Sequence, residues 1–217
     1  MKLEGKVIAI TGASRGIGRA MAVVFARQGA RLALCARGAR ELEEAGDRAA
    51  SASVHGPGAV FLKAFDIADS AAATLWIRES VQHFGRLDVL VNNAGILGLR
   101  APIYDYHEKV WEDSCRVNIN GTFFVTKAVL TEAMLKQRSG LIINISSGVG
   151  RVGKAEWGAY AVAKFALEGF NQVLANDLKD AGIISIGLNP EATRTGMRAE
   201  AYPQEDPQAL KTPEAFA

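Results

Sequence analysis

The chain has 217 residues, of which 49% are hydrophobic and 22% charged, with a formal net charge of +2. This composition excludes intrinsic disorder, collagen-like structure and a disulfide scaffold, and it fits one globular domain. Cys35 and Cys115 lack metal-ligand spacing, so we expect two small buried hydrophobes in a reducing, cytoplasmic compartment and no metal. Because the sequence has no long apolar window, no signal-peptide core and only scattered Lys and Arg, we expect neither a membrane nor a nucleic acid as partner.

Apolar runs alternate along the chain with amphipathic stretches. Strands are predicted over residues 7–11, 31–36, 60–65, 87–91, 141–145 and 183–188. Helices are predicted over residues 15–27, 69–84, 107–137 with an interruption near 118–121, and 157–180. Strands that are apolar on both faces and alternate with helices indicate a parallel sheet covered on both sides. We therefore predict a single α/β domain over residues 1–217, doubly wound, with ligands at the carboxyl ends of the strands.

The end of the sequence carries a helix-start signal. Thr212, Pro213 and Glu214 supply a capping residue, a proline for the first helical position and an early acid. The sequence stops three residues later, whereas a helix needs about 12 residues to be stable alone. We therefore expect the chain to be cut short.

A glycine-rich turn follows the first predicted strand directly. Gly12, Gly16 and Gly18 stand in the run Thr11-Gly12-Ala13-Ser14-Arg15-Gly16-Ile17-Gly18. Small residues at a strand-to-helix turn let the backbone approach a pyrophosphate, and the helix N-terminus supplies N–H groups and partial positive charge. The same glycines could instead serve only close packing of the helix on the strand.

The end of the second predicted strand indicates which dinucleotide would bind. An NAD site would place an acid there to hold the ribose 2′-hydroxyl, but the strand ends Cys35-Ala36-Arg37. Arg37, helped by Arg15 in the glycine turn, can pair with a 2′-phosphate. The residues therefore favour NADP(H), unless both arginines are ordinary surface charges.

Four separated motifs together resemble the short-chain dehydrogenases/reductases of the classical type. They are the turn at 11–18, Asn92-Asn93-Ala94-Gly95, Asn118, and Ser147 followed by Tyr160-Ala161-Val162-Ala163-Lys164. Within the family the sequence looks most like bacterial oxidoreductases of unassigned substrate. The resemblance implies a Rossmann-type fold whose last helix and seventh strand are missing here, assembly as a homodimer or homotetramer, and hydride transfer between NADP(H) and a small carbonyl or secondary-alcohol substrate.

The resemblance also implies roles for particular residues. The implied catalytic set is Asn118, Ser147, Tyr160 and Lys164. The implied or inferred cofactor-binding set is Gly12, Ser14, Arg15, Gly16, Ile17, Gly18, Arg37, Asp66, Ile67, Asn93, Ala94, Gly95, Tyr160, Lys164, Pro190, Thr193 and Thr195. Asn118 is implied to hold a water that links Lys164 to solvent, although an asparagine is also tolerated at a helix bend.

The spacing of Tyr160 and Lys164 supports an acid–base role independently of the family. Residues four apart share one face of a helix, and an ammonium about 5 Å from a phenolate lowers the phenol pKa by roughly two units. We therefore expect a tyrosine with a pKa shifted toward neutrality, although an exposed helix with a lysine stem over a tyrosine gives the same spacing. Ser147 follows a predicted strand and can donate to a developing alkoxide. Ser146 is a rival for this role, and only the resemblance, through the family's spacing to the tyrosine, selects Ser147 and leaves Ser146 to satisfy backbone groups.

One segment departs from the family pattern. Glu191 follows Pro190 where glycine is usual, and a glutamate does not easily adopt positive φ. This puts the backbone there, and a carboxamide contact from Thr195, in doubt.

The substrate pocket is predicted from three segments, 96–106, 149–157 and 193–202. Trp157, Tyr104 and Tyr106 could stack on a substrate, but loop aromatics more often close local packing. Three arginines would suit an anionic substrate if they converged: Arg100, Arg151 and Arg194.

The favoured function is an NADP-dependent carbonyl reductase or alcohol dehydrogenase. A 3-oxoacyl thioester reductase is a close alternative, and it would need a basic docking patch for an acidic carrier. An NADP-binding regulator or scaffold without turnover is the alternative from another class.

Overall fold

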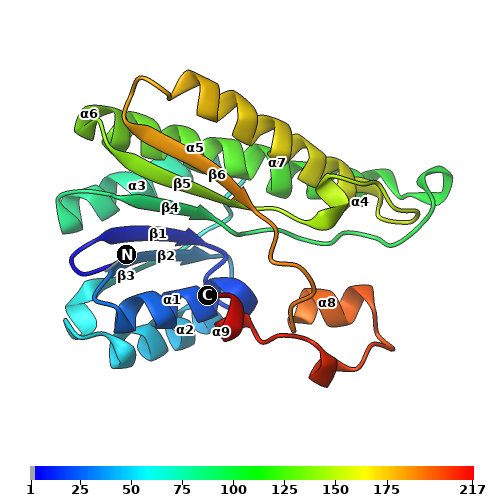
Figure 1. The fold of residues 1–217 in the computed structure, drawn as a ribbon, viewed down its shortest axis with the longest axis horizontal. Helices are drawn as coiled ribbons and strands as arrows, with labels where there is room; N and C mark the ends of the chain where they lie inside the picture. The colour runs from blue at the N-terminus through cyan, green and yellow to red at the C-terminus, as the bar shows by residue number, and fades with distance from the viewer. Residues whose placement is uncertain (1–2) are drawn as a thin grey trace.

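The computed structural model describes residues 3–217, and its centre is a parallel sheet (Figure 1). Within this range the sheet has six strands in the order β3-β2-β1-β4-β5-β6. The strands are β1 (Val7–Thr11), β2 (Arg31–Ala36), β3 (Val60–Ala64), β4 (Val89–Asn92), β5 (Gly140–Ile145) and β6 (Ile183–Leu188). Since the order reverses between β1 and β4, the sheet is doubly wound and has a switch point there, as predicted.

Helices cover both faces of the sheet. They are α1 (Gly16–Arg27), α2 (Ala39–Ala52), α3 (Ser70–Phe84), α4 (Glu108–Cys115), α5 (Thr122–Val129), α6 (Leu135–Gln137), α7 (Gly158–Asp177), α8 (Gly196–Ala201) and α9 (Pro213–Phe216). In Figure 1, α1, α2 and α9 lie on one side of the sheet, and α3, α5 and α7 lie on the other. No helix among residues 3–217 is both long and apolar enough to cross a membrane.

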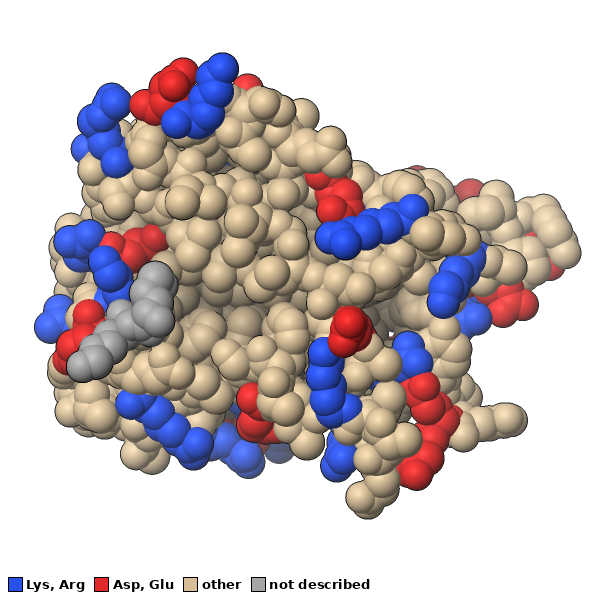
Figure 2. Space-filling view, viewed as in Figure 1, with Lys and Arg blue, Asp and Glu red and all other residues tan. Residues whose placement is uncertain are grey.

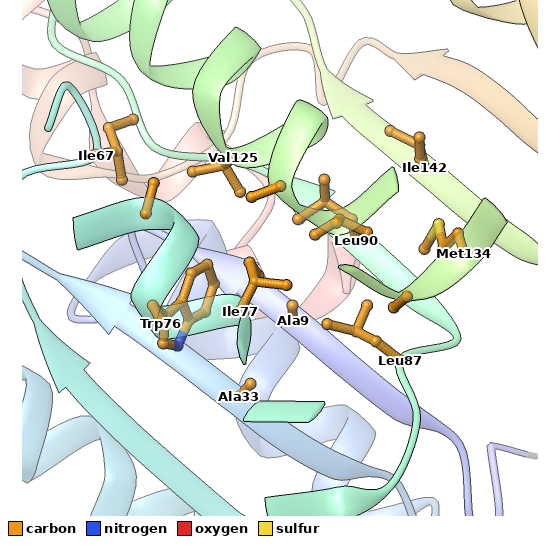
Figure 3. Packing of buried hydrophobic residues seen from close by; sticks show 14 of the residues in the cluster. Ala9, Ala33, Ile67, Trp76, Ile77, Leu87, Leu90, Val125, Met134 and Ile142 are labelled. Atoms are coloured by element: carbon orange, nitrogen blue, oxygen red, sulfur yellow. The ribbon is translucent and has the colours of Figure 1, made fainter. Parts of the chain in front are cut away.

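Alternate side chains of each strand enter two different cores. Ile8 and Ile10 of β1 pack with α1 and α2, whereas Ala9 between them packs with α3 and α5. Figure 3 shows the second core, in which Trp76 and Ile77 of α3 lie over Ala9 and Ala33. Burial on both faces explains why the strands read as unbroken apolar runs rather than alternating ones.

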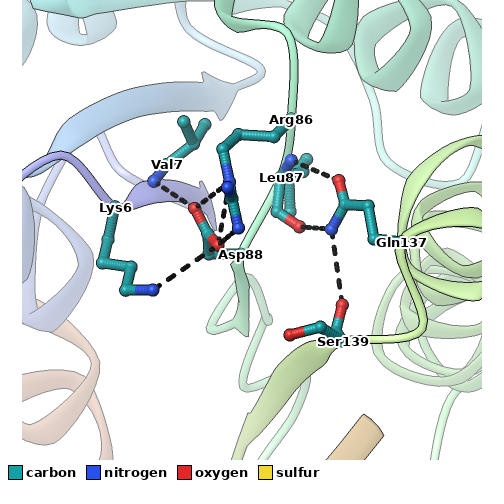
Figure 4. Close-up of polar contacts among 7 residues, drawn as sticks. All are labelled: Lys6, Val7, Arg86, Leu87, Asp88, Gln137 and Ser139. Carbon is teal, nitrogen blue, oxygen red and sulfur yellow. Dashed lines mark hydrogen bonds and ion pairs between the residues drawn. The ribbon is translucent and has the colours of Figure 1, made fainter. Parts of the chain in front are cut away.

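A polar network joins the amino ends of β1 and β4 (Figure 4). The Asp88 carboxylate accepts the Val7 N–H at 2.9 Å and is held by the Arg86 guanidinium, with Nε–oxygen distances of 3.0 and 3.1 Å. The Gln137 amide brackets Leu87, since it accepts the Leu87 N–H at 3.0 Å and donates to its carbonyl at 2.9 Å. These side chains fix the strand register at the edge opposite the carboxyl ends.

The structure corrects two helical predictions. Helix α2 was not predicted, because its buried stripe of Leu42, Ala45, Gly46 and Ala49 is small amid many charges. The segment 107–137 stays helical throughout, and its interruption is a π-helical turn at Arg116–Gly121, with a second at Leu130–Met134. Strands β1, β2 and β6 have the predicted bounds, and the other strand ends differ by one or two residues.

The helix signal near the end of the sequence is confirmed. The Thr212 hydroxyl accepts the Ala215 N–H at 3.2 Å and thereby caps α9. Phe216 then packs against the α1 side of the sheet. The last turn of the chain is therefore anchored beside the first helix.

Candidate active site

A cleft of about 730 Å³ lies at the carboxyl ends of the strands, at the switch point between β1 and β4. Figure 2 shows the surface hollowed beside the α8 segment, with charges of both signs interspersed around it. Of the predicted cofactor residues, all but Gly18 line this cleft: Gly12, Ser14, Arg15, Gly16, Ile17, Arg37, Asp66, Ile67, Asn93, Ala94, Gly95, Tyr160, Lys164, Pro190, Thr193 and Thr195. Ser147 lines it too, whereas Asn118 lies behind its wall.

The glycines of the turn serve two roles: some allow close packing of the helix on the strands, and one lines the cleft where a pyrophosphate could approach. Gly12 has φ +66°, and a Cβ there would lie 2.8 Å from the Ala94 Cα. At Gly18 a Cβ would collide with the Gly12 carbonyl oxygen. These two glycines therefore permit close packing of α1 and β4. Gly16, at φ +56°, lines the cleft, and a Cβ added there would lie 3.5 Å from the Thr195 methyl, which is ordinary contact.

The first turn of α1 offers an anion site. Its capping residue, Arg15, makes no side-chain hydrogen bond to the turn, and the turn contains no acid. The N–H groups at a helix start need partners, and the helix dipole adds partial positive charge. Because Ser14, Gly16 and Ile17 line the cleft at this point, the turn fits the pyrophosphate of a dinucleotide.

The side chains of Thr11 and Asn93 hold the floor of the cleft. The Thr11 hydroxyl accepts the N–H groups of Asn93 and Ala94, each at 3.0 Å. The Asn93 amide donates to the carbonyls of Thr11 at 2.9 Å and Gly12 at 3.2 Å. These bonds join the ends of β1 and β4, so Asn93 supports the glycine turn as well as lining the cleft.

Both predicted arginines, Arg15 and Arg37, are exposed and line the cleft. Asp66 lies nearby and accepts from Arg116 at 2.9 Å and from the Ala68 N–H at 3.0 Å. Although partial burial opposes it, these hydrogen bonds and the positive charges lower the Asp66 pKa. The sequence did not indicate Glu41, a cleft-lining acid in the first turn of α2, because that helix was itself missed.

Tyr160 and Lys164 meet at the inner end of the cleft. Lys164 Nζ lies 5.5 Å from the centre of the Tyr160 ring and donates to the Ile145 carbonyl at 2.6 Å. Both side chains are buried. The pairing is therefore the one that the four-residue spacing predicted.

The expected shift of the Tyr160 pKa toward neutrality is not found in this structure. Burial raises the pKa of Tyr160 to about 12, and the hydrogen bond with Ser147 only partly opposes this. Burial also lowers the pKa of Lys164 to about 8, against the opposing charge of Glu168. The prediction was wrong because it included the ammonium charge and omitted the cost of burying both ions.

The structure separates the two neighbouring serines. Ser146 is buried, and its hydroxyl donates to the Glu168 carboxylate at 2.5 Å rather than to the expected backbone group. Ser147 lines the cleft beside Tyr160, and its hydroxyl accepts a long 3.4 Å bond from the Val149 N–H. Both serines line the cleft, but the Ser146 hydroxyl is occupied by Glu168, so Ser147 is the better placed of the two to bond a ligand.

Asn118 lies in the π-helical turn at Arg116–Gly121. Its side-chain oxygen accepts the Ile96 N–H at 2.8 Å, and its amide donates to the Ile96 carbonyl at 2.9 Å. This reciprocal pair fixes the start of the loop that precedes α4. Asn118 therefore shapes the cleft wall from behind.

Glu191 does adopt the left-handed conformation, with φ +56°. Its carboxylate pairs with Lys211 at 3.0 Å, and the Thr193 hydroxyl donates to the Pro190 carbonyl at 2.9 Å. The backbone thus follows the course that a glycine would allow, and Thr195 caps α8 through a 3.1 Å bond from the Arg198 N–H.

Of the three aromatic candidates for substrate contact, only Trp157 lines the cleft. Tyr104 is 86% exposed. The Tyr106 hydroxyl accepts the Leu99 N–H at 2.9 Å, and its ring packs on Trp111. Tyr106 therefore closes local packing, which is the alternative that the sequence favoured.

Comparison with known proteins decides the family. Residues 6–206 match the model of the short chain dehydrogenases. This chain belongs to the short-chain dehydrogenase family.

Relatives of this short-chain dehydrogenase span nearly all of it. The oxidoreductase YciK of Escherichia coli K12 is 40% identical over 211 residues, which cover 97% of this chain and 82% of YciK. The 3-oxoacyl-acyl-carrier-protein reductase FabG of Pseudomonas aeruginosa is 38% identical over 210 residues, covering 97% and 82%. A Shigella flexneri short chain dehydrogenase, crystallised in complex with NADP, has a TM-score of 0.91 at 39% identity, covering 98% of this chain and 88% of that one.

Proposed function

We propose that this short-chain dehydrogenase uses NADP(H) to interconvert a small carbonyl compound and its secondary alcohol. One observation carries the proposal: Ser147, Tyr160 and Lys164 line the same cleft as an uncapped helix N-terminus flanked by Arg15 and Arg37. NADP(H) in relatives of known structure supports the choice of cofactor. The 191–217 segment forms the substrate side in this proposal.

The bound cofactor supplies or accepts the hydride, and the protein handles the proton. In reduction, Tyr160 donates its phenolic proton to the carbonyl oxygen while the Ser147 hydroxyl donates a hydrogen bond to that oxygen. Burial raises the pKa of Tyr160 to about 12, so the phenol holds its proton at neutral pH. Lys164 is held beside Tyr160 by its hydrogen bond to the Ile145 carbonyl. Asn118 acts as a positioning residue through Ile96.

Substitution of the phenol tests the proposal. Tyr160→Phe should abolish NADPH oxidation with carbonyl substrates and leave the dissociation constant for NADPH within about twofold, because the ring and its packing remain. Tyr104→Phe, which removes an exposed hydroxyl outside the cleft, is the matched control. Full turnover in Tyr160→Phe would refute the assigned role. NADPH binding without turnover of any carbonyl by the unmodified chain would favour the regulator instead.

Parallel titration with NADPH and NADH tests the cofactor choice. The paired variant Arg15→Ala and Arg37→Ala should lose at least about tenfold in NADPH affinity and little in NADH affinity, because a 2′-phosphate is the only group that differs. Arg40→Ala is the control, because Arg40 is three residues from Arg37 in the sequence but does not line the cleft. An equal loss for both cofactors would contradict the assignment.

We further propose a cytoplasmic homodimer or homotetramer. Val162, Phe165 and Val173 project from one side of α7 with 44%, 46% and 57% of their surface exposed, at spacings that form one stripe. Cys35 and Cys115 are free thiols, which suits a reducing compartment. Light scattering of the full chain and of Phe165→Glu tests the assembly: a monomeric mass for the unmodified chain would refute it.

A further inference from the structure

The cleft beyond Tyr160 has an apolar wall, here called the apolar end. Leu97, Trp157, Met197 and Ala201 line the cleft there and pack in one cluster with Tyr160. The ring centres of Trp157 and Tyr160 are 5.6 Å apart, so a ligand whose carbonyl lies at the Tyr160 hydroxyl would place the rest of its ring or chain along the Trp157 indole. Apolar and aromatic walls with a few placed polar groups are characteristic of sites for uncharged small molecules.

Among the described residues, four cations line the cleft, and none is free at the apolar end. Arg15 and Arg37 lie at the glycine turn and the end of β2. Lys164 is held by the Ile145 carbonyl. The Arg198 guanidinium forms a bidentate salt bridge with the Glu205 carboxylate, in which both nitrogen–oxygen distances are 2.6 Å. A carboxylate at the apolar end would therefore lose water without gaining a free partner.

Arg100 supports the wall from outside the cleft. Its guanidinium donates to the Ala201 carbonyl at 2.9 Å and lies 4.8 Å from the Trp157 ring centre and 5.4 Å from that of Tyr202. A further bond of 3.3 Å reaches Glu156. Arg100 thus joins α8 to Trp157 through contacts that leave it turned away from a ligand.

Arg151 and Arg194 do not converge with Arg100. Arg151 pairs with Glu168 at 3.3 Å, and Arg194 donates to the Leu210 carbonyl at 3.4 Å. None of the three lines the cleft. The condition under which these arginines would receive an anionic substrate is therefore not met.

We propose that this enzyme acts on uncharged, apolar ketones or aldehydes whose ring or chain lies on Trp157, and that Arg100 positions that wall. This rests on the proposed function, since it places the reacting carbonyl at Tyr160. Burying an unpaired carboxylate is costly, so a charged analogue should bind at least about tenfold more weakly than a neutral one of the same shape.

Methyl 4-acetylbenzoate and 4-acetylbenzoate form a matched pair, because they share the ketone and the ring and differ in charge. Calorimetric titration of the full chain saturated with NADP⁺ should show at least about tenfold tighter binding of the ester. Equal or tighter binding of the carboxylate, or no binding of either, would overturn the proposal. Binding with this preference but without NADPH oxidation would refute the proposed function and support only the preference of the apolar end for uncharged ligands.

Two variants test the wall itself. Trp157→Ala should weaken binding of the ester about tenfold and binding of acetone less than twofold, with recovery in Trp157→Phe. Arg100→Met should weaken ester binding several-fold and leave NADPH affinity unchanged. An anion receptor would behave oppositely, because Arg100→Met would then weaken only the carboxylate. Arg78→Met, which removes an exposed arginine paired with Glu132, is the control.

Discussion

Replacement of Gly12 by alanine tests whether the glycine turn is held by packing as well as by conformation. A left-handed alanine costs about 1–2 kcal/mol. The new Cβ would lie 2.8 Å from the Ala94 Cα, whereas carbon atoms pack at about 3.5–4.0 Å. The backbone of β4 must therefore move away, which adds about 1–3 kcal/mol. We expect Gly12→Ala to lower the free energy of unfolding by about 3–4 kcal/mol.

Two other glycines separate these contributions. Gly85 ends α3 with φ +81° and has no described atom within 4 Å of its added Cβ, so Gly85→Ala should cost only the conformational 1–2 kcal/mol. Gly18 has an ordinary φ, and its Cβ would lie 2.6 Å from the Asn93 amide nitrogen. Its packing cost of about 1–3 kcal/mol is partly offset by the roughly 1 kcal/mol that alanine gains in a helix.

Urea unfolding of the three variants, followed by fluorescence titration with NADPH, measures both effects. Gly12→Ala should be the least stable and should lose at least about tenfold in NADPH affinity, while Gly85→Ala should bind NADPH normally. If Gly12→Ala unfolds within about 0.5 kcal/mol of Gly85→Ala, the close approach of the turn to Ala94 contributes nothing, and the reasoning fails.

Three further predictions concern buried polar groups. Lys164 has a pKa of about 8 in the folded chain and 10.5 in the unfolded chain, so between these pH values the unfolded state holds the extra proton and the free energy of unfolding rises with pH. Over this range the unmodified chain should gain about 3 kcal/mol of stability relative to Lys164→Met. A difference between the two chains that stays constant with pH in urea unfolding would refute this. Asp88→Ala removes the partner of the Val7 N–H and of Arg86 and should cost about 2–3 kcal/mol without changing NADPH affinity. Asp113→Ala, which removes a partly exposed carboxylate paired with Lys109 and Arg116, should cost less than about 1 kcal/mol, and similar losses for the two variants in thermal unfolding would contradict the prediction. Trp76 is fully buried and its indole N–H has no described partner, so Trp76→Phe should cost about 1 kcal/mol and Trp76→Ala about 3–5, and a Trp76→Phe variant as unstable as the alanine would show that the N–H matters.

The strands were predictable because burial on both faces leaves a signal in the sequence itself. Every residue of β1 is buried, and its side chains alternate between two cores, so the run is apolar up to Thr11 at its end. The same reasoning missed α2, since its buried residues are mostly alanine and glycine and carry little hydrophobic signal. The fold class survived this omission because strand order and crossover handedness determine the winding.

The candidate site was predictable in its members and less so in its electrostatics. The glycine turn, Tyr160 and Lys164 could be found because local spacing and strand ends determine where they meet, whereas Ser147 was chosen over Ser146 by its spacing in the family motif. The raised pKa of Tyr160 could not, since it depends on burial by residues distant in sequence. Glu191 likewise shows that an unfavourable φ is accepted where an ion pair, here with Lys211, and the neighbouring turn hold it.

The network around Asp88 and Gln137 has an evolutionary consequence. It fixes the amino edge of the sheet, with bonds from side chains to the Val7 and Leu87 backbone, while the cleft opens at the other edge. Mutations that change the shape of the apolar end affect side chains that do not help to fix the register of the sheet. A lineage could therefore exchange Trp157 or Met197 and acquire a new substrate without first repairing its scaffold.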